Sequence, residues 1–188
     1  MDRLEKKEAG KKSSGNKASI RIAISAIMIA LGVILSAYPG AIPIGPTKVF
    51  PFQHMINGIA GFLLGPFYAG GIALAIGILR IGIGTGTVFA IFGGVPGALV
   101  VGFVCRYLVK RPAISLVEPL GTAFGALISA FFVAPVIGAG PLPPFLGISA
   151  QWALFTIFFL MSSIPGSILG YLVLIALKRR GMLESMQN

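Results

Sequence analysis

The chain has 188 residues, of which 56% are hydrophobic and only 11% are charged, and its net charge is +10. A soluble domain has roughly 25% charged residues, so this composition excludes a soluble globular protein. Because a membrane helix needs about 20 apolar residues, the length allows about six spans joined by short loops, with no room for a separate water-soluble domain.

The N-terminal part combines a polar tail with a first apolar segment. Residues 1–19 are rich in Lys, Gly and Ser and have no apolar periodicity, so we expect a disordered basic tail. Residues 20–37 are apolar and are interpreted as a membrane helix rather than a secretory signal, because no clear cleavage site follows and the chain stays apolar. Tyr38-Pro39-Gly40 ends this helix, and the prolines up to residue 51 predict a structured, non-helical loop.

Further apolar stretches predict five more helices, separated by Gly- and Pro-rich breaks. A tight connection at Gly65-Pro66 joins the first two, and the Gly/Thr-rich run 82–87 ends the second. Residues 88–94 are expected to form a short helical or re-entrant piece, and Pro165-Gly166 is expected to kink the last helix. The five predicted helices cover residues 52–64, 67–83, 95–109, 113–136 and 148–177.

These segments together predict an all-α integral membrane protein with six transmembrane helices in a compact bundle. The membrane domain is expected to cover residues 20–180, and residues 181–188 are expected to form a short second tail. The Pro- and Gly-rich segments 39–51 and 138–147 are expected to be rigid loops at the outer end of the bundle.

The positions of the charges predict the orientation. Thirteen of the 15 Lys and Arg residues fall in three groups that the predicted topology places on one side. By the positive-inside rule this side is the cytoplasm, so both termini are predicted to be cytoplasmic. The basic charge then sets topology and attracts anionic membrane lipid, and we expect no nucleic-acid partner. The exceptions, Lys48 in the first loop and Arg80 late in the third helix, belong to the outer half.

Polar side chains inside membrane spans are costly and mark candidates for function. Gln53, His54 and Asn57 share one helix at i,i+3 and i,i+4 spacings, so they point one way, toward the bundle interior near the outer surface. Other polar or aromatic residues are expected at a similar depth. The candidate substrate-binding residues are Thr47, Lys48, Phe52, Gln53, His54, Asn57, Arg80, Gln151 and Trp152.

Chemistry-bearing residues are otherwise scarce. Glu118 is the only acidic residue in any predicted span, near the cytoplasmic end of its helix, and it is expected to pair with a basic residue there or to contact a partner. The basic residues in question are Arg106, Lys110 and Arg111. One His, one Cys and one buried Glu are too few for a metal site, and a Ser-His-Asp triad lacks its acid. We therefore expect no enzyme activity, no metal and no cofactor.

The run 82–87 superficially resembles a phosphate-binding loop. It lacks the Gly-Lys-Ser/Thr ending and a preceding strand, so we interpret it as a turn that binds no nucleotide.

Small residues recur at four-residue spacing along the apolar segments. Such spacing lets helices approach closely where lipid provides no hydrophobic driving force, and most pairs are expected to pack inside the bundle. On the first helix, Ala23, Ala26 and Ala30 form a small-residue surface near the cytoplasm that suits the docking of another membrane protein. The pairs expected inside the bundle are Gly61/Gly65, Ala73/Gly77, Gly93/Gly97, Gly121/Gly125 and Gly166/Gly170.

Taken together, these residues resemble a known family. Six predicted helices, a basic N-terminal tail, the small-residue face and a polar outer pocket are similar to the substrate-binding S component of an energy-coupling factor (ECF) transporter. More narrowly, the chain resembles the ThiW type of S component over about residues 20–177. The matching motifs are GPTKVFPFQHMIN at 45–57, AGFLLGP at 60–66, and Gly77-x-x-Arg80 with Gly84-Thr-Gly86.

The resemblance implies a subunit that captures a thiamine precursor, with the hydroxyethylthiazole moiety as the expected ligand, outside the cytoplasmic membrane of a prokaryotic cell. It further implies docking through Ala26 and Ala30 on a transmembrane T component driven by two ATPase subunits, toppling during transport, and a lid formed by residues 39–51. A small heteroaromatic alcohol needs stacking surface and a few hydrogen bonds. We expect stacking from Tyr38, Phe50, Phe52 and Trp152, and hydrogen bonds from His54, Asn57 and Gln151.

Two other functions stay open from the residues alone. No acidic group is expected in the outer pocket, which argues against thiamine itself, a permanent cation. Lys48 and Arg80 are also compatible with an S component for another uncharged or anionic vitamin. A self-sufficient channel or ion-coupled carrier is the further alternative, against which stand the single intramembrane acid and the lack of an obvious repeat.

Overall fold

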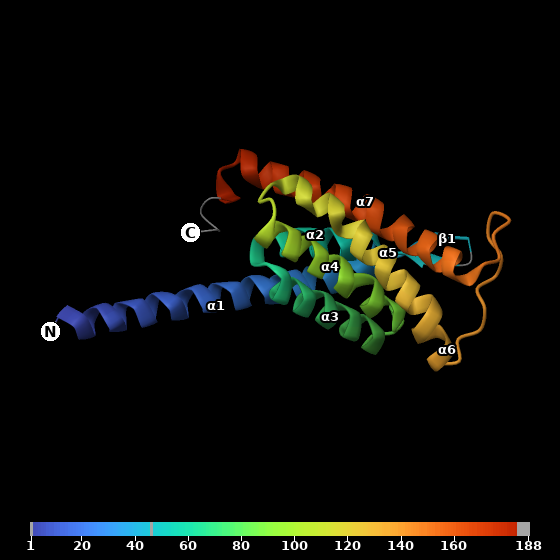
Figure 1. Cartoon of the computed structure of the whole chain (residues 1–188), viewed down its shortest axis with the longest axis horizontal. Coiled ribbons are helices and arrows are strands. Elements are labelled where there is room, and N and C mark those ends of the chain that lie inside the picture. Colours follow the sequence, from blue (N-terminus) through green and yellow to red (C-terminus); the bar gives the residue numbers. More distant parts are fainter. Residues whose placement is uncertain (1, 46, 184–188) are drawn as a thin grey trace.

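The computed structural model describes residues 2–45 and 47–183, and the side chains of 17–45 and 47–183. The described chain is a helical bundle with one two-stranded hairpin at its end (Figure 1). Residues 112–136 form one continuous helical segment that contains a 3₁₀ turn (η1) and a π-helical turn (η2). The elements are α1 (Asp2–Ala37), β1 (Ile42–Ile44), β2 (Thr47–Val49), α2 (Pro51–Leu64), α3 (Pro66–Gly82), α4 (Phe89–Tyr107), η1 (Pro112–Val117), α5 (Glu118–Ile128), η2 (Ser129–Val133), α6 (Ala134–Val136) and α7 (Gln151–Arg179).

The N-terminal segment is helical, contrary to the expectation of a disordered tail over 1–19. α1 begins at Asp2 and extends beyond the rest of the bundle (Figure 1). Lys, Glu and Ala are good helix formers, and extending an existing helix is easier than starting one, so the apolar part of α1 continues into the polar part. At the other terminus, residues 184–188 of the expected tail lie outside the described residues, whereas Leu183 is buried in the core.

α2 is the central helix of the bundle. Ten of its 14 residues are buried, and it packs against α1, α3, α4 and α7. At 1.5 Å per residue α2 is about 21 Å long, which is shorter than the ~30 Å hydrocarbon core. A helix enclosed by other helices has no need to match the thickness of the lipid, because its ends continue into protein.

The prediction of six spans is therefore confirmed only in part. In the described residues, four helical segments are long and apolar enough to cross a membrane, and α3 is a shorter apolar helix of 17 residues. The four segments are Lys17–Ala37, Phe89–Tyr107, Pro112–Val136 and Gln151–Arg179.

α4 differs from the expected pair of pieces over 88–94 and 95–109. It is one helix from Phe89 to Tyr107 and passes through Pro96 without a break. Proline inside a helix removes one backbone hydrogen bond, but neighbouring helices make this tolerable in membrane proteins. α7 likewise continues through Pro165.

The two Pro-rich segments meet at one end of the bundle. The first is non-helical as predicted and forms an antiparallel hairpin in which Pro43 pairs with Lys48. At its turn, Gly45 has a φ of +55° and lies so close to the Phe145 ring that a Cβ would come within 2.8 Å of Cδ2. Phe145 belongs to the second segment, and its ring centroid is 5.3 Å from that of Phe158 on α7. The hairpin is thus held against the second loop and α7.

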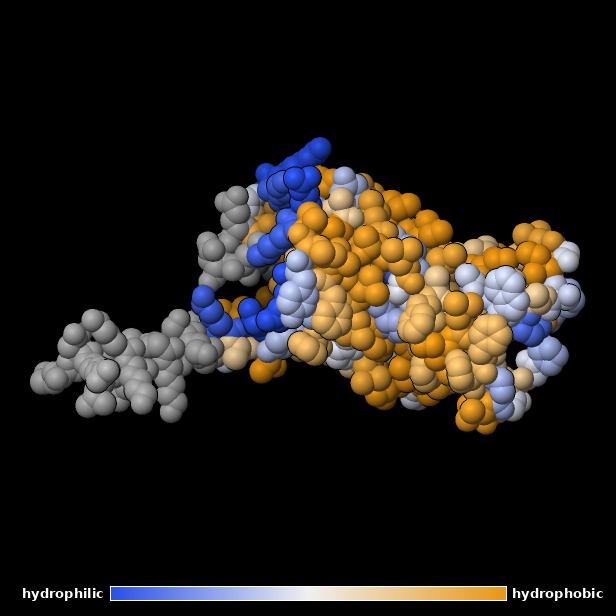
Figure 2. Space-filling model, viewed as in Figure 1, coloured by the Kyte–Doolittle hydropathy of each residue, from blue (hydrophilic) through white to orange (hydrophobic). Residues whose placement is uncertain are grey.

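Charge separates the two ends of the bundle. The N-terminal part of α1, the α4–η1 turn and the C-terminus of α7 lie at one end, whereas the hairpin and the C-terminus of α3 lie at the other (Figure 1). Figure 2 shows hydrophilic side chains gathered at the first end, beside a broad apolar surface. The described basic residues of the three groups, from Lys17 on, therefore lie at one end, and Lys48 and Arg80 lie at the opposite end. That the basic end faces the cytoplasm stays a prediction.

Small residues allow α4 and α5 to touch, as their spacing predicted. A Cβ at Gly121 would lie 2.8 Å from the Cα of Gly97, and a Cβ at Gly125 would strike the carbonyl oxygen of Phe92. Both glycines are buried. Any larger side chain at these positions must push the two helices apart.

Replacing Gly121 with Ala is therefore expected to lower the free energy of unfolding by about 1–3 kcal/mol, because the new methyl group overpacks the α4–α5 crossing. Gly71 on α3 is the matched control, since nothing lies within 4 Å of its Cβ position. Thermal unfolding of Gly121→Ala and Gly71→Ala in the same detergent measures the difference. Equal melting temperatures would contradict the close crossing.

Candidate substrate-binding site

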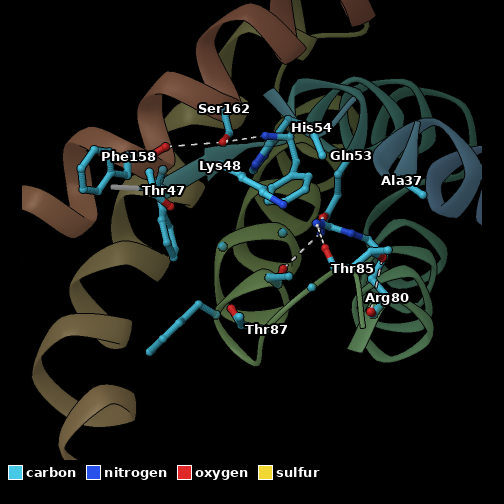
Figure 3. A pocket seen from close by; sticks show the side chains of 18 of the residues that line it. Ala37, Thr47, Lys48, Gln53, His54, Arg80, Thr85, Thr87, Phe158 and Ser162 are labelled. Atoms are coloured by element: carbon cyan, nitrogen blue, oxygen red, sulfur yellow. Dashed lines mark hydrogen bonds between the residues drawn. The ribbon is translucent and has the colours of Figure 1, made fainter. Parts of the chain in front are cut away.

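A cavity of about 680 Å³ lies at the end of the bundle that carries the hairpin. Its walls come from the hairpin, α2, the α3–α4 turn, α4 and α7. Figure 3 shows Gln53 and Arg80 pointing toward each other, with Phe158 and Ser162 of α7 on the other side. Five of the nine candidate residues line this cavity: Thr47, Lys48, Gln53, His54 and Arg80.

Polar side chains of α2 form hydrogen bonds with backbone carbonyl groups of α4. Gln53 Nε2 donates to the carbonyl oxygen of Ala90 at 3.1 Å, and Asn57 Nδ2 donates to that of Gly94 at 3.1 Å. Gly94 makes this approach possible, because a Cβ there would lie 2.5 Å from Gln53 Nε2. Buried polar groups are costly unless they are hydrogen-bonded, so glycines on α4 allow α2 to carry polar side chains inside an apolar bundle.

Glu118 lies behind the cavity wall and is fully buried. Its Oε1 is 2.7 Å from His54 Nδ1 and accepts from Asn57 Nδ2 at 3.2 Å and from Thr122 Oγ1 at 3.0 Å. Its Oε2 accepts from Ser163 Oγ on α7. One carboxyl group therefore connects α2, α5 and α7.

The expected pairing of Glu118 with Arg106, Lys110 or Arg111 is wrong. The turn η1 forms the first six residues of its helical segment, so Glu118 begins α5 inside the bundle, whereas the three basic residues stay exposed at the end. Gly97 provides the space, because a Cβ there would strike Glu118 Oε1.

The same contact assigns the tautomer of His54. A carboxylate only accepts hydrogen bonds, so the proton lies on Nδ1 and is donated to Glu118. Nε2 of His54 has no hydrogen-bond partner in the part of the chain that the structure describes. Since His54 lines the cavity, Nε2 is available to a ligand.

Arg80 is the second buried charged residue of the site, with 1% of its surface exposed. Nη1 donates to Gln53 Oε1, Nη2 donates to the carbonyl oxygen of Thr85 at 3.1 Å, and Cζ lies 3.9 Å from the centroid of the Phe50 ring. The backbone N–H groups of Thr85 and Gly86 donate to the Arg80 carbonyl oxygen, so the chain turns back around this residue. The run 82–87 is a turn, as predicted, but it also contributes to the cavity wall, which the sequence did not indicate.

Four candidate residues do not line the cavity. Asn57 is fully buried behind it, and Phe52 packs close to Gly40. Gln151 holds the second loop, because its side chain accepts from Leu142 N at 2.8 Å and donates to Leu142 O at 3.2 Å. Trp152 is 52% exposed on the outside of α7. Neither Gln151 nor Trp152 lines the cavity, because depth along the bundle does not determine which way a side chain faces.

Sequence reasoning missed the α7 side of the cavity. Phe158 and Ser162 stand four residues apart and therefore share one face of α7. Ser162 Oγ accepts from the backbone N–H of Phe50 at 3.0 Å and so ties the hairpin to α7. The adjacent serines 162 and 163 in an otherwise apolar helix were a usable signal for this face.

The lining combines aromatic rings with basic and hydroxyl groups. Besides those already described, Phe89, Phe159 and Thr87 contribute, and none of the lining residues is acidic. In the described residues no group of three or more His, Cys, Asp or Glu side chains is placed to hold a metal ion. The site is therefore suited to bind a small, planar molecule with polar substituents.

Replacing Glu118 with Ala is expected to lower the free energy of unfolding by about 3–5 kcal/mol, because it leaves the buried partners of the carboxyl group unpaired. Arg106→Gln is the control, since Arg106 is exposed and makes no pair with Glu118. Thermal unfolding of both variants distinguishes the buried network from the pairing expected from sequence. A wild-type melting temperature for Glu118→Ala would contradict the network.

Comparison with known proteins agrees with this architecture. The fold is similar to that of the S-component for biotin from an ECF-type ABC transporter, whose crystal structure is known at 2.1 Å. The TM-score is 0.65 at 21% sequence identity, and the match covers 92% of this chain and 98% of that chain. No curated protein matches the sequence. The profile of the family described as "Thiamine-precursor transporter protein (ThiW)" matches residues 22–180. The chain therefore belongs to the ThiW family of thiamine-precursor transporter proteins.

Proposed function

We propose that the chain is the substrate-capture S subunit of an ECF-type ABC transporter and that it binds the hydroxyethylthiazole moiety of a thiamine precursor. The observation that carries the proposal is the cavity of about 680 Å³ at the end of the bundle opposite the basic groups. With the basic end in the cytoplasm, the cavity faces the outside of the cell, where a capture subunit meets its substrate.

The lining suits a small heteroaromatic ring. Phe50, Phe158 and Phe159 offer ring surfaces, and His54 Nε2 is free to bond a polar substituent. Thiamine itself is a permanent cation and would need an anionic partner. Among the described side chains Glu118 is the only acid, but it lies outside the lining and its oxygens already bind four side chains. The site therefore favours the thiazole precursor over thiamine.

The hairpin is proposed to act as the lid of this cavity. Its residues Pro43, Gly45, Thr47 and Lys48 form one wall of the cavity, so a movement of the hairpin would change access to the ligand site. The contacts of the hairpin include Gly45 against Phe145 and the bond from Phe50 N to Ser162 Oγ. A short segment at the end of the bundle opens more easily than the long helices around it.

α1 is proposed to carry the docking surface for the T component. Ala23, Ala26 and Ala30 are all exposed and stand at i, i+3 and i+7, which is one face of the helix. Small side chains on a lipid-facing surface let another helix approach closely. The proposal assigns ATP hydrolysis to two partner ATPase subunits in the cytoplasmic membrane complex.

Purified protein is expected to bind 4-methyl-5-(2-hydroxyethyl)thiazole, and His54→Ala and Phe158→Ala are each expected to weaken binding about fivefold, since each removes one contact worth about 1 kcal/mol. Trp152→Ala is the control, because Trp152 lies outside the cavity. Calorimetric titration in detergent gives the affinities. Unchanged affinity in both cavity variants, or an equal loss in Trp152→Ala, would overturn the site.

Ala26→Leu combined with Ala30→Leu is expected to abolish co-purification with the T component and its ATPases while ligand binding stays unchanged, because the larger side chains prevent close helix approach. Ala176→Leu is the control, as Ala176 is exposed on α7. Intact assembly of the double variant would contradict docking through α1. Substrate uptake by the chain alone in liposomes would contradict the S-subunit role and favour a self-sufficient carrier.

A further inference from the structure

Arg80 is buried without an acidic partner. It is 1% exposed and lines the cavity, yet its hydrogen bonds go to the amide of Gln53 and to a backbone carbonyl, both of which are neutral. A buried charge is costly unless it is paired, and an ionisable residue within a membrane protein that lacks a partner points to a functional one.

Among the described side chains no carboxylate is bound to Arg80. Glu118 is the only acidic residue between positions 9 and 183, and it is bound to His54, Asn57, Thr122 and Ser163. The ion pair among the described side chains joins His54 to Glu118. The described part of the chain therefore supplies no counter-ion for Arg80.

The guanidinium keeps donors for such a counter-ion. Nε of Arg80 is buried and has no hydrogen-bond partner in the described part of the chain. The Phe50 ring covers one face of the group and Gly86 lies close to Cζ, so the in-plane N–H groups are the positions left for a ligand. Two in-plane donors match the two oxygens of a carboxylate or phosphate.

Other cavity residues agree with a negative ligand. Lys48 on the hairpin lines the same cavity and is a second cation without a described acidic partner. The turn beside Arg80 adds the hydroxyl group of Thr87 to the wall. Both cations that fall outside the three basic groups of the sequence therefore face one space.

We propose that the cavity binds its aromatic ligand as an oxyanion, a thiazole that carries a carboxylate or a phosphate ester, with Arg80 as the principal anion-binding residue and Lys48 as the second. This inference rests on the proposed function, because it specifies the form in which the thiazole precursor is captured. Gln53 and the Phe50 ring supply weaker, neutral contacts to Arg80 that the oxyanion supplements.

The first measurement needs no variant. Wild-type protein is titrated with 4-methyl-5-(2-hydroxyethyl)thiazole, with its phosphate ester and with 4-methylthiazole-5-carboxylate. At least one of the two anions is expected to bind about tenfold or more tightly than the neutral alcohol, and their order identifies which oxyanion the site prefers.

Variants then test the residues. Arg80→Gln is expected to abolish the preference for the anion, so that the ratio of the anion and alcohol affinities falls to about one. Arg80→Lys is expected to retain part of this preference, since Lys keeps the charge without the planar pair of donors. Gln53→Glu places a carboxylate against Arg80 and is expected to cause the same loss with the arginine still present. Lys48→Gln is expected to weaken the binding of the anion and not that of the alcohol. Arg106→Gln, at the basic end, is the matched control and is expected to change neither affinity.

The outcomes separate the inference from the proposed function. If the alcohol binds as well as both anions, or if the anion preference survives in Arg80→Gln and Gln53→Glu, the oxyanion inference is overturned while the S-subunit function stands. If no thiazole compound binds to the wild-type protein, the proposed ligand fails and the inference fails with it. Thermal unfolding of each variant shows that it is folded, and Gln53→Glu and Lys48→Gln keep the test valid should Arg80→Gln not fold.

Discussion

The hydrogen-bonded carboxyl group of Glu118 is the interaction on which the arrangement of this bundle depends. It receives side chains from α2, α5 and α7, and three glycines of α4 and α5, Gly97, Gly121 and Gly125, leave room for it and for the close helix crossing. Inside a membrane no water is available to form hydrogen bonds with such a group, so its partners must come from the protein. The polar face of α2 is therefore both a structural necessity and the floor of the cavity.

Because the single acid of the membrane domain is used in this network, the rest of the site has an excess of positive charge. His54 faces Glu118 with one ring nitrogen and leaves the other available, whereas Arg80 has only neutral neighbours. The same scarcity of acids makes the cavity unsuited to a cation. One buried pairing thus influences stability, the orientation of His54 and the charge that a ligand can carry.

Several parts of this protein follow from sequence periodicity and composition, and others do not. The boundaries of α2 and α3 and the non-helical first loop were predictable because Gly and Pro interrupt long apolar runs at 38–51 and 65–66. The helical start of α1 and the continuity of α4 through Pro96 were not, because local propensity does not show how far a helix is supported by its neighbours. Five cavity-lining residues could be selected from the sequence because polar residues are rare in such a chain: Thr47, Lys48, Gln53, His54 and Arg80. Phe158 could not, because it is one aromatic residue among many.

The sequence by itself determined the membrane class, the segregation of basic charge and the small set of polar residues, since these depend only on composition and on position along the chain. The tertiary structure decided which polar groups meet. It buried Glu118 beneath His54, turned Gln151 and Trp152 away from the cavity and brought Lys48 and Arg80 into it. The physical reason is that partners in a helix bundle are chosen by helix rotation and by contacts over 27 to 64 residues of separation, such as Arg80 with Gln53 and His54 with Glu118, which spacing within one helix does not encode.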